Sequence, residues 1–236
     1  MKQRLKWRYL YHKLSRKADR ILTVSNFSAE RLGHFFPALR ERIRVVPSAV
    51  PSRFFEPVSP SGEDALAKIG LANRQFVMAP SGLHHRKNAD LILRAWPLLR
   101  QKYPDLLLVV TSHCDPHYLA QTRALGASVR VLGFVDDELL CSLYHAAAAL
   151  WFPSLYEGFG LPPLEAMACG TPVVASNNSS LPEIAGEAAI LVSPASMQEN
   201  IDALDTILRT PAVVSRLVAA GRERALLFTW AKAGEK

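Results

Sequence analysis

The sequence has 236 residues, 49% of them hydrophobic, and a formal net charge of +7. This length suits one core domain with additional elements. A domain of this size can bury roughly 70% of the surface that its unfolded chain exposes. No apolar run reaches the roughly 20 residues of a membrane span, and no signal peptide is evident. The three cysteines, Cys114, Cys141 and Cys169, are far apart, which favours reduced thiols and a cytoplasmic protein over a disulfide framework.

Positive charge is concentrated in residues 1–20, which contain only one acidic residue. The eight Lys and Arg residues there are Lys2, Arg4, Lys6, Arg8, Lys13, Arg16, Lys17 and Arg20. Apolar residues recur there at helical spacing, so the segment predicts a basic amphipathic helix. Such a helix can lie on an anionic membrane surface, or it can pack on a neighbouring domain with its basic face in water. We expect no nucleic-acid partner, because no basic stripe with stacking aromatic residues continues elsewhere.

Two short strands are predicted next, at residues 21–24 and 43–46, with a helix between them that ends at Phe36. Ser25 or Ser28 is suited to cap this helix. Residues 47–62 are rich in Pro and Ser, and we interpret them as a linker.

From residue 73 onward, strand-like and helix-like segments alternate. The predicted strands are 76–79, 106–111, 129–133, 149–152, 172–175 and 189–192. The predicted helices are 88–103, 117–125, 137–147, 164–169, 181–185, 195–208 and 211–228. Strands that are apolar on both faces and alternate with helices predict an α/β fold, a Rossmann-like parallel sheet with helices on both faces. Such sheets bind ligands beyond the carboxyl ends of their strands.

The loop that follows the first of these strands, residues 80–88, carries two adjacent cations at a helix start. Arg86 and Lys87 precede Asn88, a suitable N-cap residue. They are either two exposed charges or a binding site for an anion. Because positive charge at a helix N-terminus opposes the helix dipole, we expect an anionic partner here.

Residues 154–170 read Ser-Leu-Tyr-Glu-Gly-Phe-Gly-Leu-Pro-Pro-Leu-Glu-Ala-Met-Ala-Cys-Gly. They join an apolar strand end to a short helix, with Pro162 and Pro163 suited to its first turn. The N–H groups of such a turn can hold a phosphate. Glu157 and Glu165 flank the turn, and since carboxylates repel phosphate, we expect them to accept hydrogen bonds from hydroxyls. A site with backbone amides that bind phosphate and carboxylates that bind hydroxyls indicates a sugar nucleotide as the ligand.

The run from Tyr156 to Gly170, with its fixed spacing of Glu157 and Glu165, resembles the signature of family 4 (group 1) glycosyltransferases of the GT-B fold. The resemblance continues through residues 171–176 and 180–183. It implies that residues 73–236 are the C-terminal nucleotide-sugar-binding domain. Residues 1–72 would then be a remnant of the N-terminal acceptor domain, with its linker.

The resemblance also implies roles for individual residues. Glu157 would face the transferred sugar, and Arg86 and Lys87 would stabilise the charge that develops on the leaving diphosphate. Many members carry this arginine at the place of Gly82, whereas one branch shares the Arg-Lys-Asn arrangement. The implied donor-binding residues are Gly82, Phe134, Val135, Gly158, Phe159, Gly160, Leu161 and Glu165. Among them, Phe159 and Gly160 would present backbone amides, Glu165 would accept the ribose hydroxyls, and Phe134 is either a core residue or a stacking platform near the base.

The implied function is that of a retaining glycosyltransferase in polysaccharide biosynthesis. It would move a hexose from a nucleotide diphosphate-sugar, with GDP-mannose slightly favoured and a UDP-sugar next, to a glycan or lipid-linked acceptor. No metal or other cofactor is implied, and His113, Cys114 and His117 lack the spacing of a tetrahedral site. One alternative is a non-catalytic sugar-nucleotide-binding module that needs a separate acceptor-domain partner. The other is a protein peripheral to the inner face of the membrane, in which the basic helix matters most.

Overall fold

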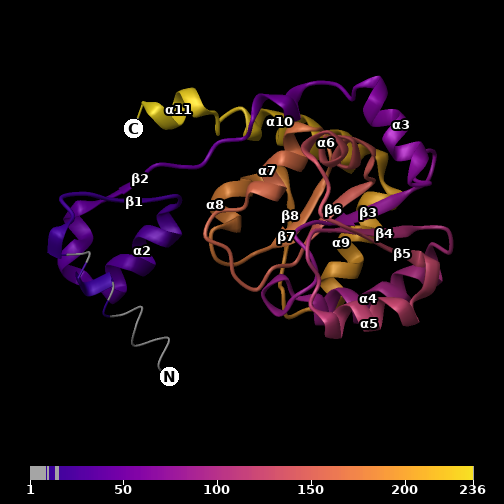
Figure 1. The fold of residues 1–236 in the computed structure, drawn as a ribbon, viewed down its shortest axis with the longest axis horizontal. Helices are drawn as coiled ribbons and strands as arrows, with labels where there is room; N and C mark the ends of the chain where they lie inside the picture. The colour runs from indigo at the N-terminus through magenta and orange to yellow at the C-terminus, as the bar shows by residue number, and fades with distance from the viewer. Residues whose placement is uncertain (1–8, 10, 14–15, 236) are drawn as a thin grey trace.

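The computed structural model describes residues 9, 11–13 and 16–235 (Figure 1). The basic helix predicted for residues 1–20 therefore lies largely outside the described residues. No helix within the described residues combines the length and the hydropathy that a membrane crossing requires.

A small unit opens the described chain. Its strands β1 (Ile21–Thr23) and β2 (Ile43–Val45) pair in parallel and are connected by helix α2 (Asn26–Phe35) and a 3-10 helix (Pro37–Arg42). Of the two predicted caps, Ser25 is the one used: its hydroxyl accepts a hydrogen bond from the backbone N–H of Ser28, 3.1 Å away. The cap satisfies one of the N–H groups that a helix start leaves unpaired.

The segment interpreted as a linker is partly folded. It contains a 3-10 helix (Ser52–Phe55), and helix α3 (Pro60–Lys68) begins within it. Phe54 is buried in the core, and α3 packs against α6 (Asp137–Ala146). The sequence pattern misled here because Pro and Ser are common both in linkers and in helix starts: Ser59 caps α3, and Pro60 occupies its first turn.

A six-stranded parallel sheet forms the body of the molecule, with the order β5-β4-β3-β6-β7-β8. Its strands are β3 (Phe76–Ala79), β4 (Leu107–Thr111), β5 (Val129–Gly133), β6 (Ala149–Phe152), β7 (Val173–Ser176) and β8 (Ile190–Val192). Each predicted strand is present, with bounds that differ by at most one residue. In this order the chain runs outward from β3 to one edge, returns to β6, and then builds the other half. The adjacent strands β3 and β6 therefore form the topological switch point, where doubly wound sheets bind their ligands.

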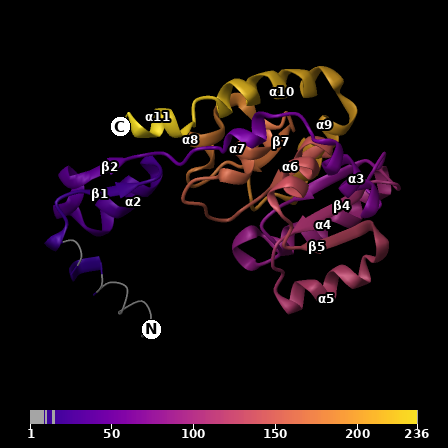
Figure 2. The same cartoon turned by 45° about the horizontal axis from the view of Figure 1, so that its top comes forward.

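Helices cover both faces of the sheet (Figure 1). The helices are α4 (Ala89–Lys102), α5 (Pro116–Ala124), α6, α7 (Leu161–Ala168), α8 (Leu181–Ala185), α9 (Met197–Arg209), α10 (Pro211–Ala225) and α11 (Trp230–Gly234). Helix α10 lies along the outside of α7, and α11 continues it toward the N-terminal unit (Figure 2). This is the predicted α/β architecture with helices on both faces.

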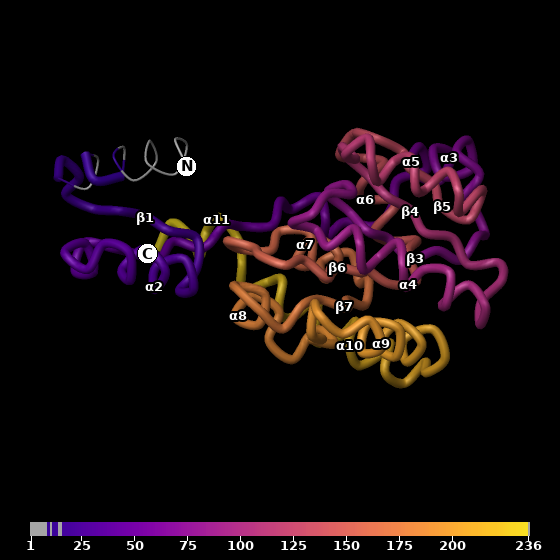
Figure 3. Tube along the Cα trace, turned by 90° about the horizontal axis from the view of Figure 1, so that it is seen from below, coloured from indigo at the N-terminus to yellow at the C-terminus, as the bar shows by residue number. Residues whose placement is uncertain are grey.

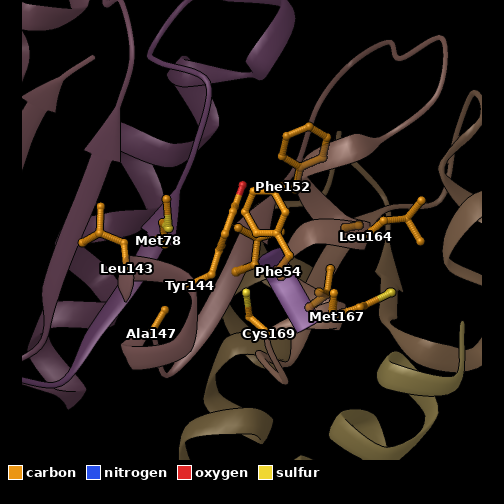
Figure 4. Close-up of a cluster of buried hydrophobic side chains, with 14 of the residues drawn as sticks. Phe54, Met78, Leu143, Tyr144, Ala147, Phe152, Leu164, Met167 and Cys169 are labelled. Atoms are coloured by element: carbon orange, nitrogen blue, oxygen red, sulfur yellow. The ribbon is translucent and has the colours of Figure 1, made fainter. Parts of the chain in front are cut away.

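Alternate strand residues build two separate cores. Phe76 and Met78 of β3 face one core, which α6, α7 and α8 complete, whereas Val77 faces the other, which α4 and α9 complete. The first core packs Phe54 and Tyr144 edge to face, with ring centroids 6.0 Å apart (Figure 4). Successive side chains of a strand point to opposite faces of the sheet, so a strand that is apolar throughout is buried on both faces. Both cores hold the strand ends, and thus the loops beyond them, in fixed positions.

Candidate functional site

The loops after β3 and β6 are bound to each other at the switch point. The backbone N–H of Leu155 donates to the carbonyl of Arg86 at 2.9 Å. The buried side-chain amide of Asn88 donates to the carbonyls of Pro153, at 3.0 Å, and Pro194, at 2.8 Å. Asn88 occupies the N-cap position of α4, as predicted, but its side chain makes no capping hydrogen bond, and its amide nitrogen instead donates to these two loop carbonyls. Its backbone is left-handed, with φ of 60°, which turns the loop sharply into α4.

Three predicted catalytic residues meet where the loops join. The carboxylate of Glu157 accepts from Lys87 Nζ at 2.6 Å and from an Arg86 guanidinium nitrogen at 2.9 Å. The same guanidinium nitrogen lies 3.2 Å from the carbonyl of Tyr156. Glu157 is 11% exposed and Lys87 7%, whereas Arg86 is 50% exposed. The two cations and one carboxylate give the cluster a net charge of +1. Arg86 is the member of the cluster that solvent reaches.

Lys87 lies in an unusual place for an ammonium group. Burial and the nearby Arg86 guanidinium lower its pKa, while the Glu157 carboxylate opposes this effect. Its Nζ also lies 4.2 Å from the ring centroid of Phe152, within reach of a cation–π interaction. A buried charge requires such partners. The chain therefore maintains a fixed, desolvated cation at the ligand-binding edge of the sheet.

Gly82 has a structural reason to be glycine. Its φ is +79°, and a Cβ atom there would lie 1.6 Å from the carbonyl oxygen of His113. A side chain at position 82 is therefore incompatible with this backbone. Positive charge in this loop comes instead from Arg86 and Lys87.

The loop Glu157–Gly160 is held through its carbonyls. The hydroxyl of Ser180 lies 3.0 Å from the carbonyl of Glu157 and 2.6 Å from that of Phe159, and the hydroxyl of Ser179 accepts from Glu157 N–H at 3.1 Å. Within the described chain, the N–H groups of Gly158, Phe159 and Gly160 meet no hydrogen-bond acceptor. These three N–H groups therefore have no protein partner in the described residues. Ser179 and Ser180 have no role that the sequence predicts, because a serine carries no signal that its hydroxyl will meet a distant carbonyl.

Glu165 lies apart from this cluster. Helix α7 begins at Leu161, three residues earlier than predicted, so Glu165 occupies the second turn rather than the first. Its carboxylate accepts from the hydroxyl of Tyr144 at 3.0 Å, and burial raises its pKa. Tyr144 is itself buried beside Phe54 and Cys169 (Figure 4). Cys169 packs as a small apolar residue in this core.

Glu165 lines a cavity of about 310 Å³ between the ends of β3, β4 and β5 and the start of α7. Its lining residues are Pro80, Ser81, Thr111, Ser112, Val135, Leu140, Tyr144, Leu161, Pro162 and Glu165. The predicted residues Val135 and Leu161 thus share this cavity with Glu165. Phe134 does not: its side chain is 84% exposed beside it, so it is no core residue.

A second, larger hollow of about 480 Å³ lies elsewhere, between Pro47 and the start of α11. None of the predicted site residues lines it. Among the described residues, no three side chains of His, Cys, Asp or Glu converge as metal ligands would, the segment His113–His117 included. The groups suited to an anionic, hydroxyl-rich ligand are therefore concentrated at the carboxyl edge of the sheet.

The fold and this site define a doubly wound α/β domain with a buried lysine and three loop amides that meet no protein acceptor in the described residues. The sequence model described as "Glycosyl transferases group 1" matches residues 63–224. The chain belongs to this family of glycosyltransferases.

Curated relatives include mannosyltransferases. The chain is 36% identical over 231 residues to the O-antigen chain mannosyltransferase B of Escherichia coli, covering 93% of this chain and 59% of that protein. It is 33% identical over 228 residues to the MMP alpha-(1->4)-mannosyltransferase of Mycolicibacterium hassiacum, covering 92% of this chain and 52% of that protein. The chain thus spans little more than half the length of these relatives.

Solved glycosyltransferases of the GT-B type share the fold. The sucrose-phosphate synthase of Thermosynechococcus elongatus superposes with a TM-score of 0.76 at 31% identity, over 92% of this chain and 56% of that one. The Anabaena protein Alr3699/HepE, solved with UDP and glucose, superposes with a TM-score of 0.84 at 22% identity, over 97% of this chain and 64% of that one. The larger sheet therefore has the architecture of one half of a GT-B glycosyltransferase.

Proposed function

We propose that this chain is the donor-binding part of a retaining glycosyltransferase of family 4. It would bind a nucleotide diphosphate-sugar and transfer the hexose to a glycan or lipid-linked acceptor. The observation that carries the proposal is the Glu157–Lys87–Arg86 cluster, which lies at the switch point beside three backbone amides without partners. The proposed boundary between the acceptor-side remnant and this domain is residue 72.

The roles follow from charge and position. Lys87 and Arg86 would approach the diphosphate, whose negative charge grows as the bond to the sugar breaks, so these cations favour the transition state over the ground state. Glu157 has further acceptor lone pairs and would receive hydrogen bonds from sugar hydroxyls. Glu165 would do the same for the ribose from inside the cavity, with Val135 and Leu161 lining it. Phe134 would lie over the nucleobase, because its exposed ring stands at the same edge.

The sugar and the base are proposed from the relatives. Two mannosyltransferases at 36% and 33% identity favour a mannose donor, and GDP-mannose is the form we favour over a UDP-sugar. No metal is needed in this proposal, because two side-chain cations and the loop amides would face the diphosphate. The E. coli relative acts on an O-antigen chain, which supports a polysaccharide acceptor here.

A melting-temperature screen against UDP-, GDP-, ADP- and dTDP-sugars tests donor binding. A donor at 100 times its dissociation constant adds about 2.7 kcal/mol to the free energy of unfolding, which is readily measured. Lys87→Ala should abolish most of this shift. Its matched control is Lys102→Ala, which removes a half-exposed lysine at the C-terminal end of α4, 3.3 Å from Asp205 of α9. No shift with any donor would refute the proposal, and equal loss in the two variants would refute the role of Lys87.

Transfer is tested separately, with the purified chain, the donor that the screen selects, and oligosaccharide acceptors. Transfer with retained configuration supports the enzyme. If the chain binds the donor but transfers sugar only after an acceptor domain is added, the result would instead support the non-catalytic module.

Contact with an anionic membrane through residues 1–20 is a further part of the proposal. The described residues of that segment include Tyr9 and Tyr11, both exposed. Sedimentation with anionic liposomes should fall when residues 1–20 are removed. Unchanged sedimentation after the truncation would contradict membrane contact by this segment.

A further inference from the structure

The start of helix α2 is bound to the loop that carries Glu157. The hydroxyl of Ser25 donates to the carbonyl of Gly158 at 2.6 Å, and the hydroxyl of Ser28 donates to the same oxygen at 3.1 Å. These serines precede Gly158 by 133 and 130 residues. They belong to the N-terminal unit, which these bonds join to the loop after β6 and which lies on the α8 side of the larger unit (Figure 3).

A second contact fixes α2 in this place. One oxygen of the Glu183 carboxylate, on α8, accepts from the backbone N–H and the side-chain amide of Asn26, both at 2.8 Å. The other oxygen accepts from the backbone N–H of Phe27 at 3.0 Å. The Phe27 ring also meets the Tyr156 ring edge to face, with centroids 5.4 Å apart. A carboxylate at a helix start satisfies unpaired N–H groups and complements the helix dipole, so the start of α2 is held by α8 as well as by the Gly158 carbonyl.

The bound carbonyl determines the direction of an amide. The peptide between Gly158 and Phe159 is planar and trans, so its N–H points away from its C=O. With the carbonyl bound by α2, the Phe159 N–H points away from α2, and it meets no protein acceptor in the described residues. Without this contact the peptide could rotate, because Gly158 has no side chain to restrict it.

Hydroxyl groups bind the first three carbonyls of the loop Glu157–Gly160. Ser180 binds those of Glu157 and Phe159, and Ser25 and Ser28 bind the one between them. Hydrogen bonds to a carbonyl polarise its peptide and strengthen the N–H of the same peptide as a donor, by about 10–30% per hydrogen bond. These three carbonyls are thus occupied, whereas the N–H groups of Gly158, Phe159 and Gly160 meet no protein acceptor in the described residues.

We propose that Ser25 and Ser28 are positioning residues of the donor site, which hold the Gly158 carbonyl so that the Phe159 N–H is aimed at an anionic oxygen of the donor diphosphate. The inference rests on the proposed function. Its new element is that residues outside 73–236 complete the donor site. Movement of the N-terminal unit would then change the affinity for the diphosphate without any direct contact to it.

Two variants separate this role from helix capping. Ser28→Ala removes one donor to Gly158 and leaves the Ser25 cap intact. Ser25→Asp keeps an acceptor for the cap but has no hydrogen to donate to the carbonyl. Ser28→Thr keeps the hydroxyl and serves as the conservative rescue. Ser61→Ala is the matched control, since it removes a serine hydroxyl that donates to Glu138, away from the site.

The experiment measures the affinity of the full chain for UDP, GDP, ADP and dTDP and for the corresponding nucleosides, by NMR titration. For whichever diphosphate binds the wild type, we expect Ser28→Ala and Ser25→Asp to weaken binding about three- to tenfold. Nucleoside affinity should change less than twofold, and Ser28→Thr and Ser61→Ala should match the wild type. The Phe159 amide resonance should shift on diphosphate addition in the wild type and shift less in Ser28→Ala.

Three outcomes would overturn the inference. No binding of any of the four diphosphates to the wild type would refute the proposed function and this inference with it. Diphosphate binding that is unchanged in both variants would refute the inference alone. Equal losses for diphosphate and nucleoside would show a merely structural contact. Ser28→Ala decides the question if Ser25→Asp does not fold.

Discussion

Lys87 Nζ lies 2.6 Å from Glu157 Oε1, and both side chains are almost fully buried where the loops after β3 and β6 meet. A buried ion pair is not by itself stabilising, because both groups lose their hydration. Removal of one partner, however, leaves the other buried with an incomplete set of hydrogen bonds. The pair therefore couples two loops that come from different halves of the sheet.

This coupling can be measured in a double-mutant cycle. Lys87→Met and Glu157→Gln should each lower the free energy of unfolding, and the double variant should lose less than their sum, with a coupling energy of about 1–3 kcal/mol. The control cycle uses Arg53 and Asp137, whose ion pair at 2.6 Å is 49% and 62% exposed. Its coupling should be below about 1 kcal/mol. Chemical denaturation gives both values, and equal coupling in the two cycles would contradict the interpretation.

Gly82 offers a test of the loop backbone. Gly82→Ala should cost about 2–5 kcal/mol in the free energy of unfolding, because left-handed strain costs about 1–2 kcal/mol and the contact with the His113 carbonyl adds about 1–3 kcal/mol. Gly126→Ala is matched in φ, at +62°, but its Cβ would have open space. That variant should lose only about 1–2 kcal/mol. Urea denaturation compares the two, and similar losses would show that the approach to His113 is not restrictive.

Much of this site follows from residue types and topology alone. Apolar strands alternating with helices predict a parallel sheet, and such a sheet brings its carboxyl-end loops to one edge. That argument was enough to place Arg86, Lys87 and Glu157 at the same edge. Their ion pairs were not predictable, because the strand order that makes β3 and β6 neighbours is a property of the whole chain. The contact between Ser25 and Gly158 was also not predictable, because neither residue type carries a signal for a partner 133 residues away.

Asn88 shows how one residue type can serve two purposes. Asparagine suits a helix start, yet it also tolerates a left-handed backbone and has two amide hydrogens. The structure uses the latter properties, because the hydrogens reach two carbonyls on other loops. The N-cap prediction was wrong about the bond and right about the place at which α4 begins.

Substitutions at Asn88 separate these two properties. Asn88→Gly keeps the left-handed backbone but loses both hydrogen bonds, which should cost about 1–3 kcal/mol in the free energy of unfolding. Asn88→Ala should cost about 1 kcal/mol more, because alanine resists φ of 60°. The control is Asn73→Gly, at an exposed asparagine with φ of 58°, which should change stability by less than about 0.5 kcal/mol. An Asn88→Gly variant as stable as the wild type would show that the side-chain bonds contribute nothing.

Glu165 makes stability depend on pH. Because burial raises its pKa above the usual value of 4.5, the folded chain holds this proton more tightly than the unfolded chain does. Its contribution to stability is fully present below pH 4.5 and is lost as the pH rises through the folded-state pKa. At neutral pH the buried carboxylate therefore destabilises the ligand-free chain. Such a cost is typical of a group kept for binding rather than for the fold.

Glu165→Gln should accordingly melt at a higher temperature than the wild type at pH 7.5, and this advantage should shrink as the pH falls toward 4.5. The same variant should bind the nucleoside part of the donor more weakly, because a neutral amide is a poorer acceptor for ribose hydroxyls than a carboxylate. Glu187→Gln, at an exposed glutamate, controls for the loss of one negative charge. Thermal melts across this pH range and nucleoside titrations provide the measurements. A melting difference that stays constant with pH would contradict the assignment of this titration to Glu165, and undiminished nucleoside binding would remove Glu165 from the proposed ribose contact.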